Sequence, residues 1–300
     1  MAKLHRITFT RLRRFAPALY LLALLGSYAV TAFQPRAVPP SGTRFAELAG
    51  GVRIAYRTFG SPERGVPPVV LVHGSPGAGN VMYKLATLLA PRFHVIVPDL
   101  PGFGHSTRRI RDYSFRAHSG HLLALLDALG IERAHLVGFS MGGGVILSAA
   151  ETAPSRTASL VLLSAIGVQE HELTGNYHAN RTLHALQLAI LAFAHHGFPH
   201  FGLFTNGLLS VEYARNFYDS DQRPLRAIIQ QYNGPLLIIH GRHDVNVPVA
   251  AAREHHRLVR HSRLIELDNN HFMAFLDPEI FLAQISDFLA APGDGSPQPR

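Results

Sequence analysis

The sequence predicts an α/β fold, with a mostly parallel central sheet flanked by helices. Two observations favour it. Short apolar runs alternate with longer helical patterns along most of the chain. Residues with reactive side chains also follow directly after several of the apolar runs, where the edge of a parallel sheet would bring them together. With 300 residues, the chain is long enough for one large domain with an insertion.

Seven apolar runs are predicted to form strands, because each is short and bounded by turn residues. They cover residues 52–58, 69–73, 95–98, 134–139, 160–164, 236–240 and 263–267. The gaps between them carry helical patterns at residues 81–90, 115–129, 141–152, 248–259 and 279–289. We therefore assign residues 45–165 and 235–290 to one core, and predict that the Gly/Pro-rich segment 291–300 is disordered.

The N-terminal 33 residues predict a membrane segment. Residues 1–14 are basic and contain Lys3, Arg6, Arg11, Arg13 and Arg14. The uncharged run 15–33, at about 1.5 Å per helical residue, just spans a hydrocarbon core of ~30 Å. Because a basic flank stays in the cytoplasm, the catalytic body is expected on the non-cytoplasmic side. The run is longer than a usual signal core, which favours a retained signal-anchor over export with cleavage after Ala32. Residues 34–44 would be a linker.

The alternation of strands and helices breaks between residues 166 and 234. This interval is too long for a structureless loop. Residues 182–194, 211–218 and 224–231 have helical patterns. Aromatic residues of this insertion would give it an apolar underside, or would only pack it against the core: Phe193, Phe198, Phe201, Phe204 and Tyr213.

The pentapeptide Gly138-Phe139-Ser140-Met141-Gly142 lies between a predicted strand and a predicted helix. A sharp turn there would push the Ser140 hydroxyl out of the sheet, and glycine two residues to either side would leave room for it. Ser140 is therefore the candidate nucleophile.

A serine hydroxyl needs a histidine to take its proton and a carboxylate to orient that histidine. Asp244 follows the predicted strand 236–240, and His271 follows the strand 263–267. Asp268 and Asp277 lie near His271 in sequence, but Asp244 has the better position at a strand end. We assign the acid to Asp244 and the base to His271.

Acyl transfer also needs two backbone N–H groups to stabilise the oxyanion. Met141, directly after the candidate nucleophile, would supply one. The loop His73-Gly74-Ser75-Pro76-Gly77 follows a predicted strand and would supply the other. Ser75 is the candidate, because Pro76 has no N–H to donate.

These motifs, together with Asp99-Leu100-Pro101-Gly102-Phe103-Gly104-His105-Ser106, resemble the α/β-hydrolase fold family, on its serine esterase and lipase branch. The resemblance runs from about Phe45 to about Leu289. It implies a helical lid at residues 166–234 and a Ser140, Asp244, His271 triad that forms an acyl-enzyme. Haloalkane dehalogenases and epoxide hydrolases have aspartate at the nucleophile position, so Ser140 argues against both.

The expected reaction is hydrolysis of a small-molecule carboxylic ester with an apolar or aromatic acyl group. Amide hydrolysis as in an aminopeptidase, carbon–carbon bond hydrolysis and perhydrolysis on the same triad remain open. A non-catalytic ligand-binding protein on this scaffold is an alternative of another class. The acyl group, the alcohol and the oligomeric state are not determined by the sequence.

Composition narrows the partners. Six of the basic residues behind the net charge of +8 lie in the first forty residues, so the body is near neutral and no basic patch indicates nucleic acid. The absence of cysteine excludes disulfides, thiolate catalysis and Cys-ligated zinc. Nineteen histidines invite a metal hypothesis, but no His-Glu-x-x-His pattern completes one, so neither metal nor cofactor is expected.

Overall fold

The centre of the molecule is an eight-stranded sheet in the order β1-β2-β4-β3-β5-β6-β7-β8. The computed structural model describes residues 2–34, 37–63, 66–205 and 207–291, with side chains from Phe15 onward. The strands are β1 (Arg44–Glu47), β2 (Arg53–Phe59), β3 (Val69–Val72), β4 (Val95–Pro98), β5 (Ala134–Phe139), β6 (Thr157–Leu163), β7 (Leu236–Gly241) and β8 (Arg263–Leu267). From β4 to β8 neighbouring strands are parallel, whereas β2 is antiparallel to both β1 and β4.

All seven predicted strands are present, with shifts of up to three residues at their ends. The sequence did not predict β1. That strand has one buried residue, Ala46, between exposed Phe45 and Glu47, so it shows no apolar run. It forms through backbone pairing with β2 at the edge of the sheet.

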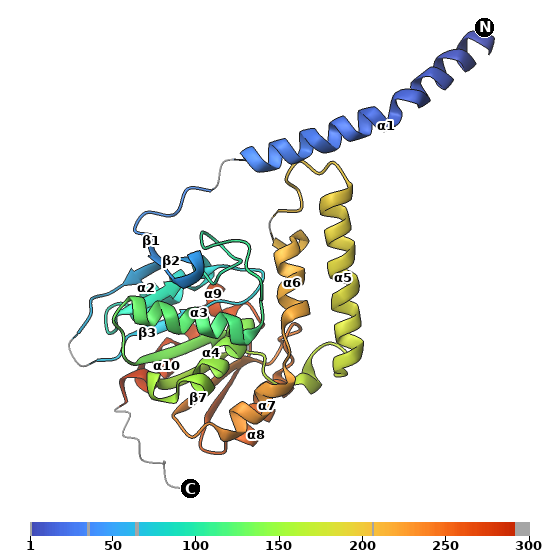
Figure 1. Ribbon diagram of the computed structural model, residues 1–300. Helices are drawn as coiled ribbons and strands as arrows, with labels where there is room; N and C mark the ends of the chain where they lie inside the picture. The colour runs from blue at the N-terminus through green and yellow to red at the C-terminus, as the bar shows by residue number, and fades with distance from the viewer. Residues whose placement is uncertain (1, 35–36, 64–65, 206, 292–300) are drawn as a thin grey trace.

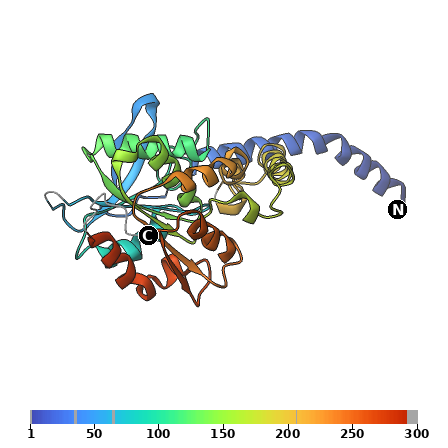
Figure 2. The same cartoon turned by 90° about the horizontal axis from the view of Figure 1, so that it is seen from below.

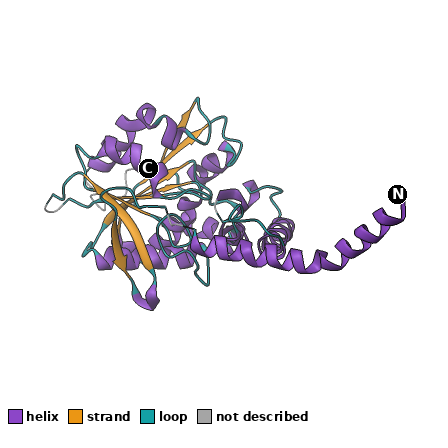
Figure 3. Cartoon of the chain, turned by 90° about the horizontal axis from the view of Figure 1, so that it is seen from above, coloured by secondary structure: helices purple, strands orange, loops and turns teal. Residues whose placement is uncertain are grey.

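Helices cover both faces of the sheet (Figures 2 and 3). They are α2 (Tyr83–Leu89), α3 (Phe115–Ala128), α4 (Met141–Thr152), α8 (Val249–Leu258), α9 (Met273–Leu276) and α10 (Leu282–Ala290). The five predicted helices are present. The first is preceded by a 3-10 turn at Gly79–Met82, and the last is divided into a 3-10 turn, Pro278–Phe281, and α10.

The strand β3 shows how the sequence builds two cores. Its side chains alternate: Val70 and Val72 pack in a cluster with α3 and α4, whereas Val69 and Leu71 pack in a second cluster with α2 and α10. All four residues are buried. A strand covered on both faces has no polar position, which explains the uninterrupted apolar runs in the sequence.

The insertion folds as three helices: α5 (Tyr177–Gly197), α6 (Val211–Asp219) and α7 (Arg223–Gln231). The helices α5 and α6 pack against each other beside the core (Figure 1). By contrast, α7 places Leu225 and Ile229 in the main core, against α4. The part that projects over the sheet edge is therefore α5, α6 and their connections.

A single helix, α1 (Ala2–Phe33), contains both the basic segment and the apolar run. Its portion Phe15–Phe33 is long and apolar enough to cross a membrane, with a mean hydropathy of 1.6 and 6% of that stretch buried. The helix extends away from the sheet and passes the C-terminal end of α5 (Figures 1 and 2). The predicted disordered tail lies outside the described residues, apart from Ala291.

Candidate active site

Ser140 lies on the turn that joins β5 to α4. Its backbone φ is +52°, a conformation that residues other than glycine rarely adopt. The turn is fixed on both sides, because Ser140 N donates to Leu163 O (3.1 Å) and Ser140 O accepts from Gly143 N (3.0 Å). Such strain persists only where the surrounding structure imposes it, and it is typical of functional positions.

The glycines around Ser140 are required by close backbone contacts. A Cβ on Gly138 would lie 2.5 Å from Gly142 O, and a Cβ on Gly142 would lie 2.4 Å from Val72 O. Both distances are far below van der Waals contact. The backbone of α4 therefore approaches β3 and β5 directly, which places the Ser140 turn at the end of the two central strands.

Asp244 and His271, which are 27 residues apart in sequence, form a buried pair. His271 Nδ1 lies 2.7 Å from Asp244 Oδ2. The other oxygen, Asp244 Oδ1, accepts backbone hydrogen bonds from Asn246 (2.9 Å) and Val247 (2.8 Å). Because the carboxylate is held on both oxygens, the imidazole ring has a fixed orientation. The ring also contacts Phe139, with 5.0 Å between centroids.

The two other carboxylates considered for this pairing have different partners. Asp268 lies on the surface with its Oδ1 2.7 Å from His243 Nε2, and Asp277 accepts a hydrogen bond from Asn269. Asp244 is the carboxylate that the described structure pairs with His271.

His240 is a neighbour of the pair that was not predicted from the sequence. Its Nε2 donates to Val247 O (2.8 Å) and lies 3.3 Å from Asp244 Oδ2, and the side chain is fully buried. Burial alone would raise the pKa of the Asp244 carboxyl, but the nearby His240 ring and the hydrogen bond from His271 hold that pKa well below its usual range. These surroundings therefore favour the anionic form of Asp244. The signal in the sequence was a histidine four residues before the acid, at a strand end.

The loop after β3 is fixed by His73. Its Nδ1 lies 2.7 Å from Gly74 O, and its Nε2 accepts from Leu100 N (2.9 Å). A Cβ on Gly74 would lie 2.9 Å from Ser140 Cβ, so this loop runs directly beside the candidate nucleophile. Gly74, Ser75 and Met141 all line the same cavity as Ser140.

A second turn supports this loop. Asp99 Oδ1 accepts from Gly79 N (2.7 Å), and Asp99 Oδ2 accepts from His105 N (2.8 Å). These hydrogen bonds give His73 and Asp99 structural roles: both side chains hold backbone segments that shape the site.

A cavity of about 690 Å³ lies between the sheet edge and the insertion. Ser140 and His271 line it from the core side. Most of the other lining side chains are apolar: those from the core include Phe115, Val247 and Phe275, and those from the insertion include Leu173, Leu208 and Phe217. No lysine or arginine is among its described lining residues. The shape suits a small apolar molecule.

The prediction that five aromatic residues form the apolar underside of the insertion is wrong for most of them. Of the five aromatic residues proposed for it, Tyr213 lines the cavity, whereas Phe193, Phe198 and Phe201 are exposed to between 48% and 66%. Phe204 packs against the His200 ring. The reason is that α5 lies outside α6, so the cavity is covered by α6 and by residues 166–173 and 207–209.

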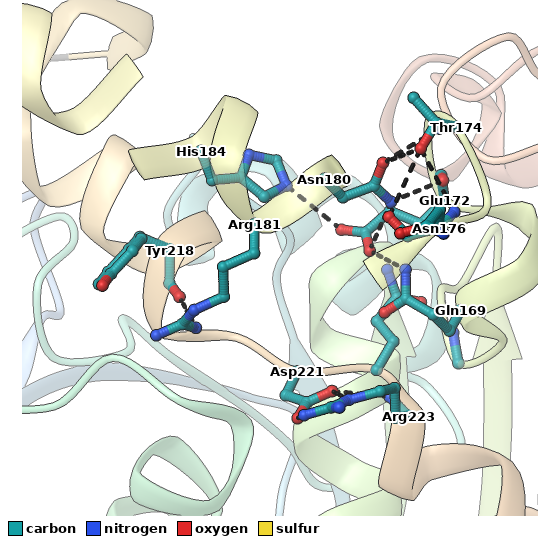
Figure 4. Close-up of polar contacts among 12 residues, drawn as sticks. Gln169, Glu172, Thr174, Asn176, Asn180, Arg181, His184, Tyr218, Asp221 and Arg223 are labelled. Atoms are coloured by element: carbon teal, nitrogen blue, oxygen red, sulfur yellow. Dashed lines mark hydrogen bonds and ion pairs between the residues drawn. The ribbon is translucent and has the colours of Figure 1, made fainter. Parts of the chain in front are cut away.

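The base of the insertion is held by a polar network around Glu172 (Figure 4). Glu172 Oε2 accepts from Gln169 Nε2 (2.7 Å) and from Asn180 Nδ2 (3.3 Å), and Glu172 Oε1 lies 3.5 Å from His184 Nε2. Burial opposes ionisation of Glu172, but the nearby His184 ring and the hydrogen bond from Gln169 lower the pKa of this carboxyl. Because Glu172 also lines the cavity, it adds negative charge to that wall.

Comparison with known proteins agrees with this geometry. The sequence model of the α/β-hydrolase fold matches residues 67–220 of the chain. The chain is 30% identical over 276 residues to the 2-hydroxy-6-oxo-2,4-heptadienoate hydrolase of Pseudomonas putida, a match that covers 81% of the chain and 95% of that protein. The chain belongs to the α/β-hydrolase family.

Other members of the family differ in how much they share with the chain. The dihydrolipoyllysine-residue acetyltransferase component of an acetoin cleaving system from Pseudomonas putida is 34% identical over 233 residues, which span 70% of the chain but 60% of that longer protein. The crystal structure of a hydrolase from Pseudomonas aeruginosa superposes with a TM-score of 0.68 at 24% identity, covering 84% of the chain and 100% of the other. This structure supports the hydrolase fold, not a substrate.

Proposed function

We propose that this α/β-hydrolase family member cleaves a carboxylic ester with Ser140 as nucleophile, His271 as general base and Asp244 as the orienting acid. The observation that carries the proposal is the buried pair of His271 Nδ1 and Asp244 Oδ2, 2.7 Å apart, on the wall of the cavity that also exposes the strained Ser140.

The geometry supports a two-step reaction. With Nδ1–H donated to Asp244, the other ring nitrogen of His271 is left to accept the Ser140 proton. The serine oxygen attacks the ester carbonyl, and backbone N–H groups of Met141 and Ser75 are the proposed donors to the oxyanion. The alcohol leaves with the proton from His271. Water, deprotonated by the same ring, then hydrolyses the acyl-enzyme.

The cavity favours a neutral substrate with an apolar or aromatic acyl group. Its described walls are mainly apolar and have no lysine or arginine side chain, while Glu172 contributes negative charge. An anionic substrate would lose its hydration in such a site without gaining a counter-ion.

Carbon–carbon bond hydrolysis is a second candidate, favoured by the relative that cleaves 2-hydroxy-6-oxo-2,4-heptadienoate. The same triad would serve it. By its name that substrate is a carboxylate, and the described cavity wall offers no arginine or lysine to bind one. For this reason we place ester hydrolysis first.

We further propose that α5, α6 and the adjoining segments act as a lid over the cavity, and that α1 anchors the chain in a membrane. The lid proposal is supported by the lining contributed by Leu173, Leu208 and Tyr213. The anchor is supported by the length, hydropathy and exposure of Phe15–Phe33. The basic residues before it favour a body on the non-cytoplasmic side.

A fluorophosphonate probe, followed by an ester panel of increasing acyl length, tests the function. The wild-type chain should be labelled and should prefer esters over a dienoate substrate. Ser140→Ala should abolish labelling and lower turnover by about three or more orders of magnitude. Ser220→Ala removes another serine that lines the cavity, and this variant should retain both the labelling and the ester turnover. Labelling of a folded Ser140→Ala variant would refute the covalent mechanism.

A further inference from the structure

The helix α5 has an apolar outer face. Its exposed residues recur every three or four positions and therefore lie on one side: His178, Ala179, Thr182, Leu183, Leu186, Ala189, Ile190, Phe193 and His196. Leu186 and Ile190 are each 56% exposed and Phe193 is 66% exposed. Its only titratable side chains are those of His178 and His196, and it carries no lysine, arginine, aspartate or glutamate.

The inner face of the same helix is partly polar, because two of its three buried residues are polar and the third is Leu191. Asn180 and His184 are buried, and both contact Glu172 (Figure 4). A helix at the surface of a soluble domain has its apolar residues inward and its polar residues outward, whereas α5 exposes four large apolar side chains: Leu183, Leu186, Ile190 and Phe193. The polarity of α5 therefore indicates that its outer face is covered by something apolar.

The apolar surface continues beyond α5. The connection at residues 198–209 exposes five more large apolar side chains: Phe198, Phe201, Leu203, Leu208 and Leu209. Isolated apolar residues on a surface are ordinary, but a contiguous patch marks an interaction site. We call the exposed residues of α5 and of this connection the lid outer face.

The helix α1 shows what lies next to this face. Ser27 Oγ accepts from the backbone N of His200 and of Phe201 (2.8 Å each), and Tyr28 OH lies 3.1 Å from His196 Nδ1. Tyr20 OH also donates to Gly197 O. These three residues of α1 all belong to the apolar run 15–33. If that run lies in a lipid bilayer, the adjacent lid outer face contacts the same bilayer.

Charge favours a lipid surface over a second protein. The described residues between Leu173 and Ser210 include no aspartate or glutamate. The pKa of the His195 imidazole is lowered by burial first, then by the nearby His200 and His196, and then by Arg109 and Arg108, which places these two arginines near the C-terminal end of α5. An apolar face that lacks acidic residues and has basic neighbours suits an anionic bilayer, where headgroups attract arginine.

We propose that the lid outer face rests on a lipid bilayer, in the leaflet that α1 enters. Leu173 and Leu208 line the cavity and are also 71% and 60% exposed, so the cavity opens at the same surface. If the proposed ester hydrolysis holds, the substrate is an ester that partitions into the membrane and enters the cavity from the lipid.

The absence of cysteine allows single labels to test this contact in the full-length chain. Leu186→Cys and Ile190→Cys place an environment-sensitive fluorophore on the lid outer face. Val66→Cys is the matched control, because this exposed apolar residue precedes β3 at the end of the strand opposite the site. The chain is reconstituted into vesicles of phosphatidylcholine and phosphatidylglycerol, with and without nitroxide-labelled acyl chains.

We expect the nitroxide lipids to quench labels at positions 186 and 190 several-fold more than the label at position 66. Equal quenching at all three positions would overturn the proposal. The proposal would also be overturned if the labels at positions 186 and 190 become shielded from water only as the protein concentration rises, without quenching by the nitroxide lipids. A second copy of the chain would then cover the face.

Activity provides a second test with separate outcomes. Leu186→Glu/Ile190→Glu should lower hydrolysis of a long-chain ester embedded in vesicles at least ten-fold, and should leave hydrolysis of soluble 4-nitrophenyl acetate unchanged. Equal rates of the variant and wild type on the embedded ester would refute entry from lipid. If the wild-type chain hydrolyses neither the embedded ester nor 4-nitrophenyl acetate, the proposed ester hydrolysis is refuted. The fluorescence experiment would still decide whether the lid outer face contacts the membrane.

Discussion

The contact between His271 and Asp244 makes a specific prediction about the acid. Asp244→Asn should lower ester turnover about 10³- to 10⁴-fold, because an amide at this position stabilises the wrong imidazole tautomer. Asp268→Asn and Asp277→Asn remove surface carboxylates with other partners and should each cost less than ten-fold. Turnover of the three purified variants on one soluble ester measures this. A larger loss in Asp268→Asn than in Asp244→Asn would reassign the acid.

Buried histidines make a prediction about pH. Burial, together with the nearby His240 and His171, lowers the pKa of His255 to about 3 from 6.5, and burial lowers the pKa of His135 to about 4. The unfolded chain then binds more protons than the folded chain below pH 6.5. Stability should fall as pH decreases from about 6.5 toward these lowered values, by about 2 kcal/mol at pH 5 for His255.

The measurement for this prediction is urea unfolding of the chain at pH 7 and pH 5. His255→Leu removes a buried ring whose two nitrogens have no hydrogen-bond partner among the described residues, so it should reduce the loss of stability between the two values. His178→Gln, which removes an exposed histidine, serves as the control. An unchanged difference in His255→Leu would contradict the assignment.

At the scale of elements, the close approach of α4 to the sheet depends on glycine. Gly142→Ala should destabilise the fold by about 1–3 kcal/mol, because its Cβ would lie 2.4 Å from Val72 O. Gly120→Ala is the matched control. Gly120 lies in α3, where an added Cβ would have no atom within 4 Å, and alanine should stabilise this helix by about 1 kcal/mol. Thermal unfolding of both variants gives the comparison, and equal melting temperatures would refute the packing argument.

The elements that sequence could predict are those with a strong local pattern. Runs such as residues 69–72 are buried on both faces, so composition alone identifies them, and the alternation with helices predicts parallel order. The strand β1 was missed because it is held by backbone pairing rather than by burial. The candidate site was predictable because Ser140, Asp244 and His271 each follow a strand; their functional roles remain proposals.

The lid shows where local pattern is insufficient. Phe193 and Phe201 were expected to face the cavity or to pack against the core, because aromatic side chains are usually buried, but both are exposed. The orientation of α5 depends on what packs on each side of it, and Asn180 and His184 occupy its inner side. A periodic pattern identifies an apolar face but does not say whether protein or lipid covers it.

At the scale of the whole molecule, the charge distribution predicts orientation. The basic residues before Phe15 should keep the N-terminus in the cytoplasm and place the body outside. Protease added to sealed spheroplasts should therefore digest a C-terminal epitope tag, and the chain should resist carbonate extraction from membranes. A shorter soluble form would indicate cleavage after Ala32. A full-length chain that is soluble in the cytosol would refute both outcomes.

The hydrogen bonds of Ser27 also have a consequence for protein engineering. Because its hydroxyl accepts from two consecutive backbone N–H groups at His200 and Phe201, this region of α1 completes the turn between α5 and α6. A generic hydrophobic leader grafted in place of α1 would supply an apolar helix but leave those two amides without Ser27 as their acceptor. The helix α1 therefore cannot be exchanged for an arbitrary apolar helix without affecting the enzyme. A chimera should reach wild-type turnover only when it carries a serine at the position equivalent to Ser27.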